Sequence, residues 1–269
     1  MWHAGEKAFQ RFYGIEERMA EIGSRVIRDF MPEQHREFFR MIPFIVAGAA
    51  DQEGQPWASL LTGSPGFISS PDATSLTIAA IPAEDDPLHG LLRDGRAIGL
   101  LGIQQHTKRR NRANGLITKA AGGKIDITVK ESFGNCPRYI TERDTEWLAH
   151  EPTLVRDAAG LSEDDRHLIR AADTLFLATT DGKDGIDASH RGGPAGFVAV
   201  EGDVLLLPNY PGNNFFNSLG NLLLHPKAGL LFIDFATGQR LHIAADAEIL
   251  QDGEEIKLRL TVTRAIRRN

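Results

Sequence analysis

The stretch GLLGIQQHTKRR, residues 99–110, returns in the second half of the chain as GLLFIDFATGQR, residues 229–240. The same offset in residue number, called the repeat offset below, recurs on both sides of this stretch over most of the 269-residue chain. The further matched pairs are Glu33 and Glu163, Arg40 and Arg170, Asp51 and Asp181, Ser59 and Ser189, Gly63 and Gly193, Gly66 and Gly196, and Phe67 and Phe197. Clustered identities at one offset indicate a tandem duplication of one domain, and only two long units argue against a solenoid.

Length and composition limit the class of protein. A chain of 269 residues fits two domains, each large enough for its own core. A net charge of -6 argues against general binding of nucleic acid, which usually requires a basic surface. The single cysteine, Cys136, excludes an internal disulfide. No apolar run approaches the roughly 20 residues of a membrane span, and the start has no apolar core of a signal peptide. These features predict a cytoplasmic protein that binds neither nucleic acid nor membranes.

Hydrophobic spacing predicts helices at the start of each half and short strands after them. Ser162 is a good N-cap for the helix that opens the second half. The predicted helices are 6–30, 33–41, 145–150, 162–171 and 213–224, and the predicted strands are 44–49, 55–61, 66–68, 76–81, 174–180, 186–191, 196–200, 204–207, 230–235 and 240–250. Short strands of similar spacing with one helix per unit are typical of a closed or nearly closed β-barrel.

Five motifs make the chain resemble a known superfamily over roughly residues 30–265. They are Gly134-Asn-Cys-Pro-Arg-Tyr-Ile140, Ser189-His-Arg-Gly-Gly-Pro-Ala-Gly-Phe197, Leu207-Pro-Asn-Tyr210, His225-Pro-Lys-Ala-Gly-Leu-Leu-Phe-Ile233 and Gln239-Arg-Leu. Together they resemble the FMN-binding split-barrel superfamily, which includes pyridoxamine 5′-phosphate oxidase. The double-barrel, oxidase-related flavoproteins of that group are the most similar, and some of those are fused to reductase modules.

The resemblance implies a mainly β fold with helices (α+β), built as a tandem duplication of a split barrel. It divides the chain into an N-terminal helical extension (1–32), a first barrel (33–140), a connector (141–160) and a second barrel (161–269). Ordinary members are homodimers with FMN at the interface, so the two halves here would form that pair within one chain. The first half carries Glu84, Asp85 and Asp86 near the expected phosphate loop, where they would repel a dianion. We therefore expect one main FMN site, built mainly by the second barrel and completed by the first.

The strand Ser189–Gly193 supplies the first candidate ligands. Period-two alternation puts Ser189 and Arg191 on one face and His190 and Gly192 on the other. The resemblance gives Arg191 the role of phosphate ligand, which suits a planar and permanently charged side chain; the alternative is a surface arginine. His190 either contacts the flavin ring or caps a strand. Gly192 either lets a ligand approach the backbone or marks a bulge.

The loop after Asn209 supplies the second set of candidates. Asn213, Asn214 and Ser218 stand at the start of the predicted helix, whose free N–H groups and partial positive charge suit a phosphate. The alternative is plain N-capping by an asparagine. The oxidase has a Ser-Arg-Lys run after its Asn-Tyr, whereas this chain has Pro211-Gly-Asn-Asn after Asn209-Tyr210.

This chain lacks the positive charges of the oxidase's Ser-Arg-Lys run. The first half can supply replacements in the run Thr107–Arg112. We expect Arg109, Arg110 and Arg112 to point across the interface toward the FMN phosphate or an anionic substrate; the alternative is a solvated hairpin tip. The resemblance makes Gln239 a ligand of the flavin ring. The histidines show no metal-ligand spacing, so we predict no metal site.

The resulting prediction is an FMN-binding flavoprotein, an oxidoreductase that transfers electrons or hydride at the flavin ring. No side chain in the sequence forces a general acid or base. The substrate is either a small molecule or a redox partner protein such as a reductase, and a homodimer is compatible with this arrangement. Pyridoxamine phosphate is disfavoured, because the family's C-terminal substrate segment is missing. The alternative is a non-catalytic module that binds haem, a deazaflavin or flavin, or a scaffold; the sequence offers no clear axial ligand for haem.

Overall fold

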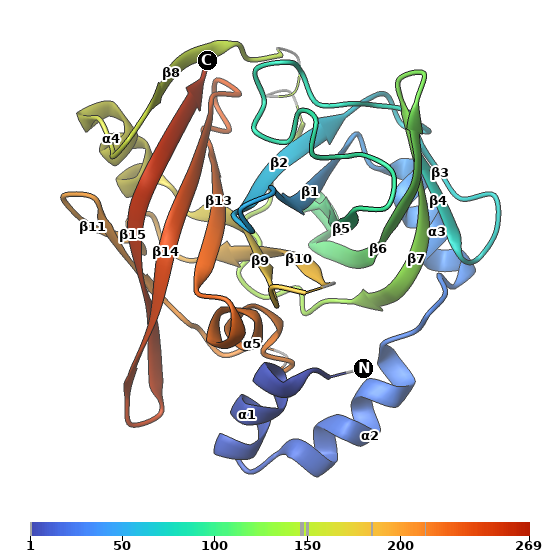
Figure 1. Cartoon of the computed structure of the whole chain (residues 1–269), viewed down its shortest axis with the longest axis horizontal. Helices are drawn as coiled ribbons and strands as arrows, with labels where there is room; N and C mark the ends of the chain where they lie inside the picture. The colour runs from blue at the N-terminus through green and yellow to red at the C-terminus, as the bar shows by residue number, and fades with distance from the viewer. Residues whose placement is uncertain (1, 146–147, 149–150, 184, 213) are drawn as a thin grey trace.

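The computed structural model describes residues 2–145, 148, 151–183, 185–212 and 214–269. The chain is mostly β-structure with helices, in two antiparallel sheets (Figure 1). The first sheet has the order β2-β1-β5-β6-β7-β4-β3 and contains β1 (Phe44–Ala50), β2 (Pro56–Thr62), β3 (Ile68–Ser69), β4 (Ser75–Ile78), β5 (Ala97–Gln104), β6 (Arg109–Ala121) and β7 (Lys124–Gly134). The second has the order β10-β9-β13-β14-β15-β12-β11 and contains β9 (Thr174–Thr180), β10 (Ile186–Gly192), β11 (Ala199–Glu201), β12 (Val204–Pro208), β13 (Lys227–Ile233), β14 (Arg240–Asp252) and β15 (Glu255–Arg268).

The two sheets correspond strand by strand. The repeat offset converts the bounds of β1 and β2 into those of β9 and β10, and the later strands agree within a few residues at nearly every end. The strands that the sequence predicts are therefore confirmed in both halves. Other strands lie outside the predicted set. They are β5, β6 and β7 of the first sheet, β15 of the second, and β8 (Leu154–Ala158), which belongs to the segment between the sheets and pairs with β15. The helix expected at 145–150 falls on a stretch of which only residues 145 and 148 are described.

The two halves are in contact through equivalent pairs of residues. In each pair, a glycine of one half lies against the backbone of the other half. A Cβ atom on Gly99 of β5 would lie 2.5 Å from the carbonyl oxygen of Ile186, and one on Gly229 of β13 would lie 2.3 Å from that of Pro56. Both glycines permit a close approach of backbones that no other residue allows. Apolar side chains from both sheets form one buried cluster here, including Val46, Leu101, Phe176 and Leu231. The interface is thus part of the core.

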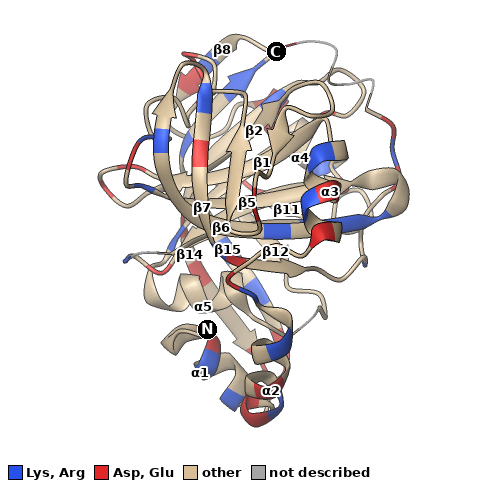
Figure 2. Ribbon diagram, turned by 90° about the vertical axis from the view of Figure 1, so that its right-hand side faces the viewer, with Lys and Arg blue, Asp and Glu red and all other residues tan. Residues whose placement is uncertain are grey.

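The N-terminal helices lie at one end of the molecule, beside the helix of the second half. These are α1 (Ala4–Phe12), α2 (Glu16–Val26) and α5 (Asn217–Leu224) (Figures 1 and 2). The prediction of a single helix over 6–30 is wrong. The chain turns at Gly14, which has φ +66°, so two short helices each bury their own apolar face. α1 crosses α5 at Gly5 and Gly220, where a Cβ atom on Gly5 would lie 2.0 Å from the carbonyl oxygen of Gly220.

The remaining helices occupy equivalent places before each sheet. They are α3 (Glu33–Met41) and α4 (Glu163–Ala171), close to their predicted bounds. Ser162 caps α4 as predicted: its hydroxyl accepts from the Asp165 amide at 3.2 Å, and the Asp165 carboxylate accepts from the Ser162 amide at 2.8 Å. α5 begins later than predicted, because Asn214 and Phe216 adopt left-handed φ values of 62° and 61°. None of the helices in the described part of the chain has the length and apolar character needed to cross a membrane.

Candidate functional site

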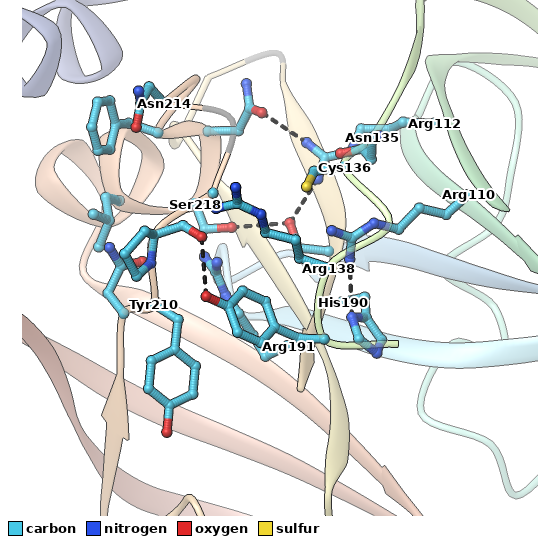
Figure 3. A pocket seen from close by; sticks show the side chains of 18 of the residues that line it. Arg110, Arg112, Asn135, Cys136, Arg138, His190, Arg191, Tyr210, Asn214 and Ser218 are labelled. Atoms are coloured by element: carbon cyan, nitrogen blue, oxygen red, sulfur yellow. Dashed lines mark hydrogen bonds between the residues drawn. The ribbon is translucent and has the colours of Figure 1, made fainter. Parts of the chain in front are cut away.

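A cavity of about 390 Å³ opens between the two halves and the N-terminal helices. Its walls come from segments far apart in the sequence (Figure 3). The first half contributes Arg110, Arg112, Asn135, Cys136, Arg138 and Tyr139, the second half contributes Ser189, His190, Arg191, Asn209, Tyr210, Asn214, Phe216, Asn217 and Ser218, and the N-terminal helices contribute Tyr13 and Ile15.

Arg112 connects the halves at the floor of this cavity. Its side chain is 4% exposed and extends from β6 to β10 of the other half. It donates to the Asp187 carboxylate and to the Ser189 hydroxyl, both at 2.8 Å, and to the side-chain oxygen of Asn217 at 3.1 Å. Asp187 is itself buried, so the pair is a desolvated ion pair held by several hydrogen bonds. Arg112 is therefore part of the framework, and its charge is balanced.

Arg110 is held by a histidine rather than by a carboxylate. One of its terminal nitrogens lies 2.9 Å from Nδ1 of His190. Burial, together with the charges of Arg110 and Arg191, holds the pKa of His190 well below its usual range. The ring is thus neutral and accepts the hydrogen bond at Nδ1. Burial, Arg112 and Arg191 in turn lower the pKa of Arg110 to about 10, and its Nε has no partner among the described residues.

Arg191 and Arg138 add two more cations that the described residues do not pair. Arg191 is half-buried, Arg138 is exposed, and neither guanidinium makes a hydrogen bond or ion pair within that part of the chain. Burial and the charge of Arg112 lower the pKa of Arg191 to about 10, still well above neutrality. Glu254 is the acidic residue among the described lining residues, and it is exposed. Three unbalanced guanidinium groups give the cavity a strong preference for an anion.

Stacked aromatic pairs flank these cations. Tyr13 of the N-terminal segment stacks on Phe216, with ring centroids 5.2 Å apart and planes 3° apart. Tyr139 of the first half stacks on Tyr210 of the second, at 5.3 Å and 25°. Tyr139, Asn214 and Phe216 are three of the four non-glycine residues with positive φ in the described chain. Such backbone strain gathered around one cavity is a pattern found at functional sites.

Most of the candidate ligands predicted from the sequence do lie together here. Arg110, Arg112, Ser189, His190, Arg191, Asn209, Asn214 and Ser218 all line the cavity. Ser218, near the start of α5, lies 3.0 Å from the Ser189 hydroxyl, oxygen to oxygen, and is buried. Asn214 lines the cavity from the loop before α5 rather than from the helix. Asn213 lies outside the described residues.

Three predicted ligands are not brought to this cavity. Arg109 turns away and donates to the carbonyl oxygen of Gln34 at 2.7 Å. Gln239 lines a separate cavity of about 580 Å³ near α4. The close approach expected at Gly192 is made by the chain itself, because a Cβ atom there would lie 2.0 Å from the carbonyl oxygen of Tyr139. Gly192 therefore borders only a small neighbouring cavity of about 50 Å³.

Other lining residues are absent from the predicted ligands. Arg138, Tyr139 and Tyr210 lie inside quoted motifs, yet no local feature of those motifs directs them to a ligand. The repeat offers one signal for Arg138, since Arg268 stands at the equivalent position of the second half. Tyr13 reaches the cavity only because the chain turns at Gly14. No local sequence pattern predicts that packing.

Comparison with known proteins finds a family match in the second half of the chain. Residues 161–265 match the model of the pyridoxamine 5′-phosphate oxidase family. These residues carry Ser189, His190, Arg191 and the loop before α5, whereas Arg110, Arg112 and Arg138 precede them. No curated protein matches the sequence.

Two solved structures show weaker likeness. An FAD-binding protein from Mesorhizobium loti has a TM-score of 0.31 and 12% identity, over 43% of this chain and 99% of its own. HutZ, the haem storage protein from Vibrio cholerae, has a TM-score of 0.30 and 14% identity, over 40% of this chain and 93% of its own. Scores this low carry no inference about a ligand of this chain.

Proposed function

We propose that this chain, a member of the pyridoxamine 5′-phosphate oxidase-like split-barrel superfamily through residues 161–265, binds FMN in the cavity between its halves. The observation that carries the proposal is the combination of unbalanced arginines with stacked aromatic side chains around one cavity. FMN unites the two groups that such a cavity suits, a phosphate dianion and a flat aromatic ring. The volume of about 390 Å³ is in the range of small-molecule sites.

The chain's own groups fit the phosphate in number and kind. The unpaired guanidinium of Arg191 is an available donor, and Arg110 adds a second positive charge to the lining. The two charges of a phosphate would balance two of the three free cations. Arg112 and Asp187 fix the floor of the site, and neutral His190 orients Arg110 without competing for the anion. Tyr13 and Ile15 cover one side and exclude water from it.

The flavin would supply electron or hydride chemistry, and the protein would supply its position and its electrostatic surroundings. We propose an oxidoreductase acting on a small molecule or accepting electrons from a redox partner protein. No side chain among the described lining residues has the geometry that would make it a necessary acid or base. His190 is the histidine among them. Because its Nδ1 accepts from Arg110, its proton lies on Nε2, and neither ring nitrogen has a free lone pair for a haem iron.

The two sheets support an origin by tandem duplication, with barrels at 33–140 and 161–269, a helical extension at 1–32 and a connector at 141–160. The shared strand order, the constant repeat offset and the exchanged glycine contacts are what such a duplication predicts. In this proposal the two barrels form, within one chain, the interface that holds the flavin.

Substitution of Arg191 tests the assignment directly. Arg191→Ala should weaken FMN binding roughly 10- to 150-fold, because a charge-assisted hydrogen bond of about 1.5–3 kcal/mol is lost. The measurement is quenching of flavin fluorescence on titration with protein. Arg109→Ala is the matched control, since Arg109 belongs to the same basic run but contacts Gln34 instead of the cavity. Equal FMN affinity in the two folded variants would remove Arg191 from the site.

A further inference from the structure

The internal repeat defines an equivalent of the proposed anion site. We call it the first-half site because Ser59, Asp85 and Asp86 come from the first half, although Arg240 and Arg268 come from the second. The repeat offset relates Ser59 to Ser189, Arg110 to Arg240 and Arg138 to Arg268, so Ser59, Arg240 and Arg268 are the equivalent set. In this first-half site the cations are not free. The Arg268 guanidinium pairs with Asp86 at 3.1 Å and with Asp85 at 2.6 Å.

Asp86 lies at the centre of this arrangement. One oxygen of its carboxylate accepts from the Ser59 hydroxyl at 2.5 Å and from Arg268 at 3.1 Å, and the other accepts from the Leu88 amide at 2.9 Å. Asp86 is 5% exposed, Ser59 is 0% exposed and Arg268 is 1% exposed. The hydroxyl, the guanidinium and the backbone N–H together bind the carboxylate as they would bind an oxyanion ligand.

The second half has no such carboxylate. At the positions equivalent to Asp85 and Asp86 it carries Phe215 and Phe216. Phe216 stacks on Tyr13 and lines the open cavity, where Ser189 and Arg138 have no carboxylate between them among the described residues. The two equivalent sites therefore differ in two respects that matter for ligands. The first-half site contains its own anion, and it has Leu61 at the position equivalent to Arg191.

We propose that Asp86 is a built-in anion that fills the first-half equivalent of the ligand's phosphate site. The chain then takes one phosphate-bearing ligand rather than two, and removal of the carboxylate creates a latent anion site at Ser59 and Arg268. This inference extends the proposed function, on which it rests for the identity of the phosphate group. Its physical basis, the buried Asp86–Arg268 pair, is independent of any flavin.

Rescue by inorganic phosphate tests the proposal. In Asp85→Asn/Asp86→Ala the buried Arg268 loses its two nearest carboxylates and keeps that of Glu151, at 3.8 Å, so the thermal unfolding midpoint should fall by roughly 10 °C. A cavity of about 410 Å³ borders Asp85 and Asp86 and gives access to them, past the carboxylates of Asp51, Glu84 and Asp157. Inorganic phosphate should restore at least half of the loss, relative to sodium chloride of equal ionic strength. The same variant with Arg268→Met added should lose this response to phosphate.

Two further variants make the test specific. Asp157→Asn removes a carboxylate from the same cavity that pairs with exposed Arg264, so its phosphate response should equal that of the wild type. Asp86→Asn removes the charge but keeps the site filled by a side chain of similar shape, so phosphate should stabilise it less than the double variant. A phosphate response no larger than that of the wild type in both Asp86 variants would overturn the proposal, as would an unchanged midpoint. Neither result involves flavin, so the proposed function is tested separately.

Discussion

At the scale of single residues, Gly192 determines where one wall of the cavity lies. It ends β10 directly after Arg191, and the carbonyl oxygen of Tyr139 occupies the space that a Cβ atom would need. Tyr139 itself adopts φ 64° and stacks on Tyr210. The segment that follows β7 is therefore pressed onto β10, and this contact sets the position of one aromatic wall.

Gly192→Ala should disturb that wall. The new methyl group would lie 2.0 Å from the Tyr139 oxygen, so the segment must move, at a cost of about 1–3 kcal/mol in the free energy of unfolding. The measurement is equilibrium denaturation, with FMN affinity measured beside it. Gly212→Ala is the matched control, because Gly212 borders the same small cavity of about 50 Å³, no described heavy atom would lie within 4 Å of its Cβ, and its φ is not positive. Equal stability of the two variants would contradict the close contact.

At the scale of elements, the packing of α1 on α5 connects the N-terminal helices to the cavity. The two helices touch at Gly5 and Gly220, and Glu6 of α1 accepts a hydrogen bond from the side chain of Asn217. Asn217 in turn accepts from Arg112 on the cavity floor. Burial first, and then the charge of Asp187, raise the pKa of Glu6 to about 7.

This carboxyl group predicts a pH dependence of stability. Its folded pKa of about 7 exceeds the ordinary value of 4.5, so the folded state binds more protons between these values. The stabilising contribution is complete below pH 4.5 and is lost as the pH rises through 7. The loss is on the order of 3 kcal/mol, because a tenfold change in an acid dissociation constant corresponds to about 1.4 kcal/mol.

Glu6→Gln should remove this dependence. The difference in unfolding free energy between the wild type and Glu6→Gln should change in favour of the variant as the pH rises from 4.5 to above 7. Denaturant titrations across that range measure it. Glu17→Gln on α2, an exposed position, serves as the control and should follow the wild type at every pH. A constant difference between the wild type and Glu6→Gln would show that Glu6 ionises normally.

At the scale of the whole molecule, the internal repeat predicts most of the fold. Strand periodicity predicts β13, the repeated Gly-Leu-Leu motif relates it to β5, and the sheet order follows the same repeat. The predicted helix over 6–30 is wrong because apolar spacing continues across Gly14, although a positive φ there reverses the chain. Such a turn is favoured by packing against α5, which periodicity along the chain does not encode.

The cavity is only partly predictable for the same reason. Two of the arginines can be predicted from local sequence: Arg191 lies in a family motif and Arg110 in a basic run. The structure brings both to one cavity. Tyr13 reaches it through tertiary packing alone. Arg109 belongs to the same basic run as Arg110, but the pleat of β6 directs it toward Gln34. Some residues of a charged run in a strand thus line a site while others face the surface. The sequence does not indicate which residues do which.

The most direct test of the central claim is an absorption spectrum of the purified protein, followed by mass analysis of the released chromophore and titration of the stripped protein with FMN. We expect flavin bands, the mass of FMN, and saturation at about one FMN per chain, since one of the two equivalent anion sites is free and Asp86 fills the other. A Soret band would instead identify a haem-binding module. A colourless protein that takes up no FMN would contradict the account and leave the paired sheets as a scaffold.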